Sequence, residues 1–396
     1  MKWEKILIGE HCTVTSSKRF HLEERCDSGV PFYCSKEIIQ KVKGEEVTEC
    51  DFISEDLYED VKKRFGVPEA GDLLITTRGT YGVPYIYKDV DRFYFADGNL
   101  TWLKDFDDSL SAQFLYYWVL SYEGQKKIDA IAKGTAQKAV PITSIKMLEL
   151  YVPSIDKQKL IVEILHNYDN LIENNQKQIK LLEEAAQRLY KEWFVDFRFP
   201  GYENTKIVDG VPEGWTVKVL SDFADVVMGQ SPKSEFYNTN KKGLPFHQGV
   251  SNYGVRYVDD DIYSTSYTRL AEPNSILFSV RAPVGRLNIT KNRIVIGRGL
   301  AAINDKNGYQ SFLYYMLKER FYKEDILGNG AIFASVSKDE LLSQKFTVPT
   351  DELVSRYNKI VNDIDKKICD LDNQIKLSSE SRDMLLPRLM GGEVEV

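Results

Sequence analysis

The side chains that could carry out catalysis in this sequence do not form a recognisable constellation. The sequence contains no Walker-type phosphate loop, no Pro-Pro-aromatic motif of the amino-methyltransferase kind, and no GxG cofactor loop after a strand. The four histidines show no paired metal spacing. The carboxylate run 259–261 favours a solvated turn, although a nuclease centre among the carboxylates stays an alternative. We therefore predict no catalytic site, no metal site and no cofactor.

The cysteines point to a reducing compartment. There are five, an odd number, and none forms a CxxC pair. A metal site among the His and Cys residues between positions 11 and 34 is conceivable, but their spacing matches no common zinc pattern, so ordinary packing is favoured. With no apolar run of membrane-spanning length and no signal peptide, we expect a cytoplasmic protein without membrane contact.

The elements that must position any functional residue are dominated by one long segment, residues 154–194. Its apolar residues recur at alternating steps of three and four, which is the heptad spacing of a helix packed along another helix. The seam consists of Leu165, Tyr168, Ile172, Asn175, Ile179, Leu182, Ala186, Leu189 and Trp193. At ~1.5 Å per residue, such a helix is roughly 60 Å long.

The expected partner helix lies in the same chain. A shift of 196 positions brings back the seam, and residues 178–181 (QIKL) recur unchanged as residues 374–377. The recurring seam consists of Val361, Ile364, Ile368, Leu371, Ile375, Ser378, Arg382, Leu385 and Leu389. We predict that the two helices pair with each other, and that Pro387 stops or kinks the second one near residues 384–386.

The repeat extends into the segments before the helices. Residues 3–8, 70–78 and 113–117 correspond to residues 215–220, 273–281 and 311–315. The short apolar runs 73–77 and 276–280 predict strands that end at an Arg, and residues 113–122 and 310–321 predict helices. The order is therefore globular, helix, globular, helix, with boundaries at 1–153, 154–204, 205–349 and 350–396.

With these features the chain resembles the specificity subunits of type I restriction–modification systems. The resemblance covers essentially the whole chain and depends on the order of short motifs at residues 71–75, 281–285, 189–197 and 385–392. It implies an α+β protein with two duplicated, mainly-β target-recognition domains separated by two long helices that form an antiparallel coiled coil. Each domain would read half of a bipartite, asymmetric double-stranded DNA target, and the helices would set the spacer.

The resemblance also implies partners: two methyltransferase subunits and then motor-nuclease subunits, the chain itself having no catalytic centre. The net charge of −7 is unusual for a DNA-binding protein, so loops or partners must supply the attraction to phosphates. The aromatic end of the first helix packs against leucines of the second helix, binds a methyltransferase, or does both, since a helix bundle exposes more than one face. The candidate partner-binding residues are Tyr190, Trp193, Phe194, Phe197, Leu385 and Leu389.

Base edges are read by polar side chains, so we expect DNA contacts from the polar loops of each domain. In the first domain the candidates are Lys18, Arg19, Arg78, Thr80, Tyr81, Lys133, Thr135 and Lys138. In the second they are Gln230, Lys233, Lys241, Lys242, Arg256, Arg281, Arg286 and Asn329. Because Arg78 and Arg281 are equivalent, bracing of the turn competes with DNA contact. A coiled-coil scaffold that never contacts bases is the alternative function.

Overall fold

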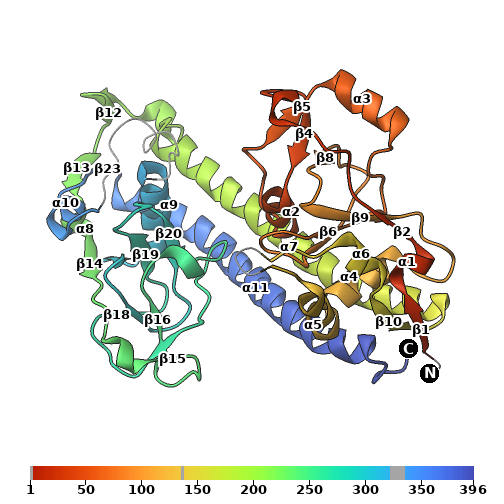
Figure 1. Cartoon of the computed structure of the whole chain (residues 1–396). Helices are drawn as coiled ribbons and strands as arrows, with labels where there is room; N and C mark the ends of the chain where they lie inside the picture. The colour runs from red at the N-terminus through yellow and green to blue at the C-terminus, as the bar shows by residue number, and fades with distance from the viewer. Residues whose placement is uncertain (1–2, 135–137, 322–334) are drawn as a thin grey trace. The chain divides into compact units, whose positions relative to one another are not determined.

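The chain divides into two compact units in a computed structural model that describes residues 3–134, 138–321 and 335–396. The first unit comprises residues 1–173 and 375–396, and the second comprises residues 174–374. Each unit therefore contains a globular part and one half of each long helix (Figure 1). Both chain ends belong to the first unit, where the backbone at Gly392 lies against the Trp3 ring.

The globular part of the first unit is built on two four-stranded sheets. One has the order β2-β9-β6-β7 and is antiparallel; the other has the order β3-β5-β4-β8, with β4 and β8 parallel. A separate pair, β1 and β10, precedes the first long helix. The strands are β1 (Glu4–Leu7), β2 (Thr13–Thr15), β3 (Arg25–Cys26), β4 (Val30–Tyr33), β5 (Asp51–Ile53), β6 (Leu73–Thr76), β7 (Pro84–Ile86), β8 (Tyr94–Phe95), β9 (Leu100–Lys104) and β10 (Glu149–Val152).

Short helices cover these sheets, and the first-unit core lies between them and the long helices. Ser111 and Ser121 cap α4 and α5 by accepting backbone N–H bonds, as expected of N-cap serines. Fully buried Phe114 and Leu115 of α4 join Ile161 in one apolar cluster. The helices are α1 (Ile8–His11), η1 (Leu22–Glu24), α2 (Ser35–Val42), α3 (Glu55–Arg64), α4 (Ala112–Leu120), α5 (Tyr122–Ile131) and α6 (Ile142–Lys146).

The second unit repeats this plan with a five-stranded sheet in place of one four-stranded sheet, and with an additional strand pair, β11 and β12. Its sheets have the orders β14-β22-β19-β20 and β15-β17-β16-β21-β18, and β13 pairs with β23. The strands are β11 (Ile207–Val208), β12 (Val211–Pro212), β13 (Thr216–Val219), β14 (Ala224–Met228), β15 (Tyr237–Asn238), β16 (Leu244–His247), β17 (Tyr263–Ser264), β18 (Leu270–Ala271), β19 (Ile276–Ser279), β20 (Leu287–Ile289), β21 (Ile294–Ile296), β22 (Leu300–Asp305) and β23 (Lys345–Val348). The short helices are η2 (Tyr202–Asn204), α8 (Leu220–Phe223), η3 (Ser234–Phe236), η4 (Val250–Asn252), α9 (Gln310–Phe321) and α10 (Lys338–Leu342).

The register of the strands confirms the duplication. Glu4 pairs with Val152 in the first unit, and at the repeat offsets Thr216 pairs with Val348 in the second. The central strand pairs agree in the same way: Leu73 is opposite Leu103, and Ile276 is opposite Ile303. A one-residue slip would reverse which side chains face the core, so equal registers mean equal cores and equal loop positions.

The long helices are α7 (Ile155–Phe194) and α11 (Asp351–Met390), each of 40 residues. Every residue of both predicted seams is buried or half-buried, which confirms the heptad pattern. In the first unit Asp169 contacts Arg382, and in the second the Ala186 carbonyl accepts a bond from Tyr357. Because residue numbers rise along one helix as they fall along the other, the pairing is antiparallel, as predicted.

Of the two outcomes expected at Pro387, a stop near residues 384–386 was wrong, since α11 runs on to Met390, while a kink there stays a prediction. A proline removes only the bond from its own nitrogen to the carbonyl four residues earlier. So close to the helix end that loss is small, and the Gly391 N–H still bonds the Pro387 carbonyl at 2.9 Å. Among the described residues, no helix is both long and apolar enough to cross a bilayer.

Candidate nucleic-acid interface

The loop between β6 and β7 carries three of the predicted DNA-contacting residues, Arg78, Thr80 and Tyr81. The Thr76 hydroxyl at the base of this loop fixes its backbone. The Thr76 side chain accepts a bond from the Val83 N–H at 3.0 Å, and the Thr76 carbonyl accepts one from the Gly82 N–H at 2.8 Å. These bonds close the loop across its ends and leave its tip in solvent.

The same scaffold occurs in the loop between β19 and β20 of the second unit. Ser279 replaces the threonine: its hydroxyl accepts from the Arg286 N–H at 2.8 Å, and its carbonyl accepts from the Gly285 N–H at 3.0 Å. Gly82 and Gly285 both have positive φ, at 80° and 87°, a conformation that favours glycine. Two loops of different sequence are therefore held in the same way.

A second loop joins each of these loops through a backbone bridge. In the first unit Arg78 bridges Ala139, which also exchanges two 2.8 Å bonds with Lys133. In the second unit Arg281 bridges Ser335, the residue 196 positions after Ala139. In the first unit the structure thus brings together two loops that were predicted separately. Two candidates in these loops, Thr135 and Asn329, lie outside the described residues.

The side chains of Arg78 and Arg281 are exposed and, within the parts of the chain that the structure describes, have no hydrogen-bond or ion-pair partner. Bracing of the turn was the competing interpretation for this equivalent pair. The hydroxyls of Thr76 and Ser279 brace the turn instead, which leaves both guanidinium groups available for a ligand.

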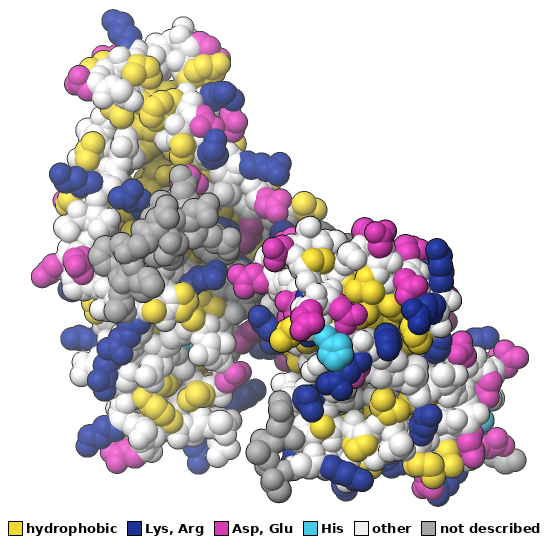
Figure 2. Space-filling model, turned by 45° about the horizontal axis from the view of Figure 1, so that its top comes forward, with side chains coloured by type: hydrophobic (Ala, Val, Ile, Leu, Met, Phe, Trp, Pro, Cys, Tyr) yellow, Lys and Arg dark blue, Asp and Glu magenta, His cyan; other side chains and the backbone are white. Residues whose placement is uncertain are grey.

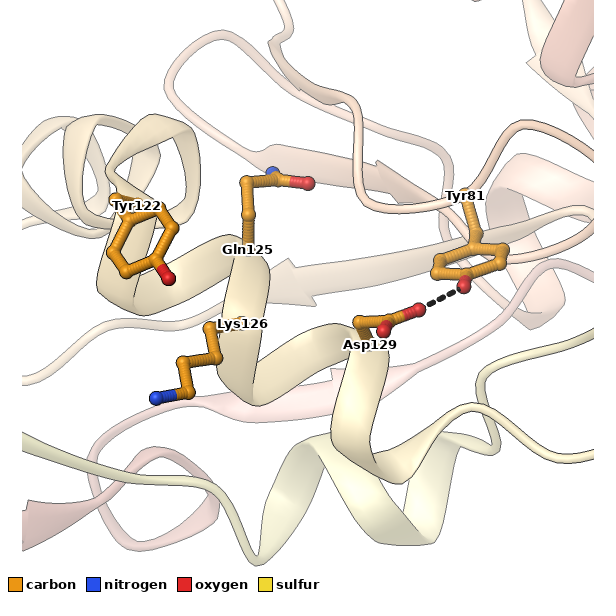
Figure 3. Close-up of a pocket in the computed structure, with 5 residues that line it drawn as sticks. All are labelled: Tyr81, Tyr122, Gln125, Lys126 and Asp129. Atoms are coloured by element: carbon orange, nitrogen blue, oxygen red, sulfur yellow. Dashed lines mark hydrogen bonds between the residues drawn. The ribbon is translucent and has the colours of Figure 1, made fainter.

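Tyr81 and Lys138 converge on a carboxylate that the sequence did not single out. The Tyr81 hydroxyl donates to Asp129 of α5 (Figure 3), and the Lys138 Nζ lies 3.4 Å from the Asp129 Oδ1. The tyrosine hydroxyl and then the lysine hold the pKa of Asp129 below its ordinary value, and Asp129 raises the pKa of Lys138. Tyr122 and Gln125 complete an open hollow beside the loop. The Asp129 carboxylate therefore partly offsets the charge of Lys138.

The first predicted loop of each unit follows an edge strand. Lys18 and Arg19 are exposed after β2; the Lys18 backbone donates to the Tyr94 hydroxyl at 2.7 Å, and its Nζ lies 5.3 Å from the Phe65 ring centroid. After β14, Gln230 is exposed and its N–H bonds the Ile296 carbonyl at 2.9 Å. The backbone of both loops is fixed while polar side chains face solvent.

The other predicted cations are also at the surface. Lys233 is exposed, 3.8 Å from Glu235. Exposed Lys241 and Lys242 occupy the turn between β15 and β16, and Arg286 is exposed at the end of its loop. On the face shown in Figure 2, Lys and Arg side chains are interspersed with Asp and Glu and form no single basic field. Attraction for a polyanion would therefore be local to the loops.

Arg256 is the predicted DNA contact that the structure places elsewhere. Its side chain is 0% exposed and pairs with Glu183 of α7 and Asp365 of α11. The prediction was wrong because two carboxylates and a stack of tyrosines, distant in sequence, surround the guanidinium group. Burial opposes its charge, but Tyr314, Tyr315 and the carboxylates raise the pKa of Arg256 well above its ordinary value. Burial likewise raises the pKa of Asp365.

The predicted partner-binding residues form buried clusters in place of an exposed surface. Tyr190, Trp193 and Phe194 are 6–8% exposed and contact the Tyr357 ring edge to face, while Phe197 contacts Trp215. The predicted packing of this aromatic end against the leucines of the second helix was also wrong, since Leu385 and Leu389 join the first-unit core instead. An antiparallel pair requires this outcome, because the C-terminal end of one helix lies beside the N-terminal end of the other.

Two kinds of functional residue escaped the sequence interpretation. The hydroxyl residues Thr76 and Ser279 sit at equivalent repeat positions, so the duplication could have indicated them. Asp129 had no such signal, because its role depends on α5 lying beside the loop. Among the described residues, no three His, Cys, Asp or Glu side chains gather as a metal site would require.

The comparisons with known proteins agree with this architecture. The family model for the type I restriction modification DNA specificity domain matches residues 1–184 and 212–378. A putative type I restriction enzyme MjaX specificity subunit from Methanocaldococcus jannaschii is 29% identical over 361 residues, covering 89% of this chain and 84% of the relative. The HindI specificity subunit from Haemophilus influenzae is 24% identical, covering 71% of this chain and 77% of the relative.

A solved structure supports the same fold. The type I restriction–modification S subunit from M. genitalium superposes with a TM-score of 0.61 at 17% identity, covering 98% of this chain and 96% of that one. At this identity the likeness speaks for the fold alone. The double match of the family model covers both globular parts and most of both long helices. The chain therefore belongs to the type I restriction modification DNA specificity domain family.

Proposed function

We propose that this chain is the subunit that gives a type I restriction–modification complex its DNA sequence specificity, and that each unit reads one half of a bipartite target. The observation that carries the proposal is the duplicated loop, held by Thr76 in one unit and by Ser279 in the other. Each scaffold presents an exposed arginine and then different residues, 79–81 or 282–284. Different side chains on equal scaffolds favour two different half-sites and thus an asymmetric target.

The proposed recognition domains are residues 1–153 and 205–349, and the proposed DNA contacts are the exposed loop residues described above, without Arg256. Arginine and lysine suit phosphates and guanine edges, and Gln230 suits adenine. We further propose that the chain has no catalysis of its own and recruits two methyltransferase subunits and motor-nuclease subunits. Supporting this, its relatives are named specificity subunits of restriction enzymes.

The test of this function is DNA binding by the complex assembled with its methyltransferase. Methylation-sensitive sequencing of the host genome identifies the modified motif, and duplexes with and without that motif are then compared over a range of salt concentrations. Selective, salt-dependent binding of a bipartite motif is expected. Equal binding of all duplexes would contradict the proposal and favour the coiled-coil scaffold. Metal-dependent cleavage by the purified chain alone would favour the nuclease alternative.

Lys133→Ala combined with Lys138→Ala is expected to weaken protection of one half-site only. Both lysines are exposed beside the bridge that joins their loop to Arg78. Removing two phosphate contacts lowers the magnitude of the slope of log K against log salt concentration by about two. Footprinting of the assembled complex measures the effect. The control is Lys62→Ala with Lys63→Ala, which removes the same charge from α3. Unchanged protection of both half-sites in the test variant would defeat the prediction.

A further inference from the structure

Arg256 attaches the second recognition domain to both long helices. Its Nη1 lies 3.2 Å from Glu183 Oε1 on α7, and its Nη2 lies 2.7 Å from Asp365 Oδ1 on α11. The guanidinium carbon stacks 3.5 Å from the centroid of the Tyr314 ring on α9. One side chain thus contacts three helices from a loop of the recognition domain.

The surrounding groups complete a buried network. Lys318 pairs with the second oxygen of Glu183 at 3.3 Å, and Ser311 donates to the second oxygen of Asp365 at 2.6 Å. Both carboxylates are therefore held from both sides. Because buried charges are tolerated only when they are paired and hydrogen-bonded, the guanidinium group cannot move away without leaving the Asp365 carboxylate without its paired cation.

The backbone next to Arg256 leads directly to a proposed DNA-reading loop. The Arg256 carbonyl accepts the Ile289 N–H at 3.0 Å, and the Gly254 carbonyl accepts the Asn288 side chain at 2.9 Å. Both donors, Ile289 and Asn288, lie on β20, the strand that follows the loop carrying Arg281 and Arg286. The Arg256 side chain and strand β20 therefore connect the two long helices to the reading loop.

In the first unit, the aspartate equivalent to Asp365 is paired with different residues. Asp169 stands 196 residues before Asp365, at the equivalent position, and accepts bonds from Tyr117 at 2.6 Å and Arg382 at 2.7 Å. Here the arginine comes from α11, so it joins the two helices to each other; within the described residues its side chain bonds Asp169 and the neighbouring Asp383 and no residue of a recognition loop. At the position equivalent to Arg382 the second unit has Ala186, which cannot supply a charge.

We propose that Arg256 is a positioning residue for DNA readout, which fixes the reading loops of the second unit on the helix pair, whereas Arg382, the partner of the equivalent aspartate in the first unit, only joins the helices. The inference rests on the proposed function. It makes readout of one half-site dependent on a residue that touches no DNA. Readout of the other half-site does not depend on Arg382 in this way.

The test compares Arg256→Met with Arg382→Met in the complex assembled with the methyltransferase. Binding is measured to the motif and to duplexes with base changes in either half-site. Arg256→Met is expected to reduce discrimination in the second-unit half-site by about tenfold or more, a change of ~1.4 kcal/mol, and to leave the first half-site unchanged. Arg382→Met is expected to show no such preference for the second half-site. Full discrimination at both half-sites in Arg256→Met, or equal loss at both, would overturn the proposal.

Loss of folding is separated from loss of positioning by a charge-balanced variant. Arg256→Met combined with Asp365→Asn removes the cation and one carboxylate together and leaves Glu183 paired with Lys318, so no buried charge is stranded. If this variant melts like the wild type yet reads the second half-site normally, the inference fails. If the wild-type complex itself shows no sequence preference, the proposed function fails instead.

Discussion

Replacing Ile179 with alanine is expected to lower the free energy of unfolding by about 2–5 kcal/mol, the usual cost of truncating a large apolar side chain in a core. Ile179 is 0% exposed in the seam between α7 and α11. The substitution removes three methyl or methylene groups and leaves a cavity that two rigid helices cannot close. Urea unfolding followed by far-ultraviolet circular dichroism measures the change.

The matched control is Leu181→Ala, two residues away on the same helix and 64% exposed. We expect its effect to stay within about 0.5 kcal/mol, because a solvent-facing leucine loses little burial. Both residues belong to the repeated QIKL sequence, so the pair separates position in the seam from sequence identity. Equal effects of the two substitutions would contradict the assigned seam, and with it the paired-helix arrangement.

Gly229→Ala is expected to destabilise the second unit by about 1–3 kcal/mol, the typical cost of overpacking, and to weaken readout of its half-site. A Cβ at this position would lie 2.0 Å from the Gly297 carbonyl oxygen and 2.8 Å from the Leu300 carbonyl oxygen. Backbone atoms cannot move aside as a flexible side chain can, so the end of β14 must shift. That shift displaces the loop that begins at Gln230.

Thermal unfolding and binding to half-site variants measure both consequences of Gly229→Ala. Gly249→Ala is the control in the same unit, since a Cβ there meets nothing within 4 Å and the backbone is extended. The control should match the wild type in both assays. A Gly229→Ala protein with unchanged melting and unchanged half-site selectivity would show that the β14 end is not clamped as described.

The sequence alone determined the features that depend on local periodicity and on duplication. The heptad spacing around Ile179 predicted both long helices, because a seam of apolar residues can be satisfied only along another helix. The repeat offset predicted corresponding strands and helices in the two units, and the structure then showed that their registers also agree. Polar loops after apolar strands, such as the one at Arg78, were recognisable for the same local reason.

Only the tertiary structure decided which distant groups meet. The sequence around Arg256 has the composition of a surface loop. Its burial follows from contacts with Glu183 and Asp365, which lie 73 and 109 positions away. The neighbours of Trp193 and Leu389 depended on the direction in which the helices pair, and Asp129 gained its role from the placement of α5. Charge pairing and side-chain stacking act between groups that are close in space. Sequence spacing therefore predicts the helices and strands of this protein, while the fold determines which charged side chains pair.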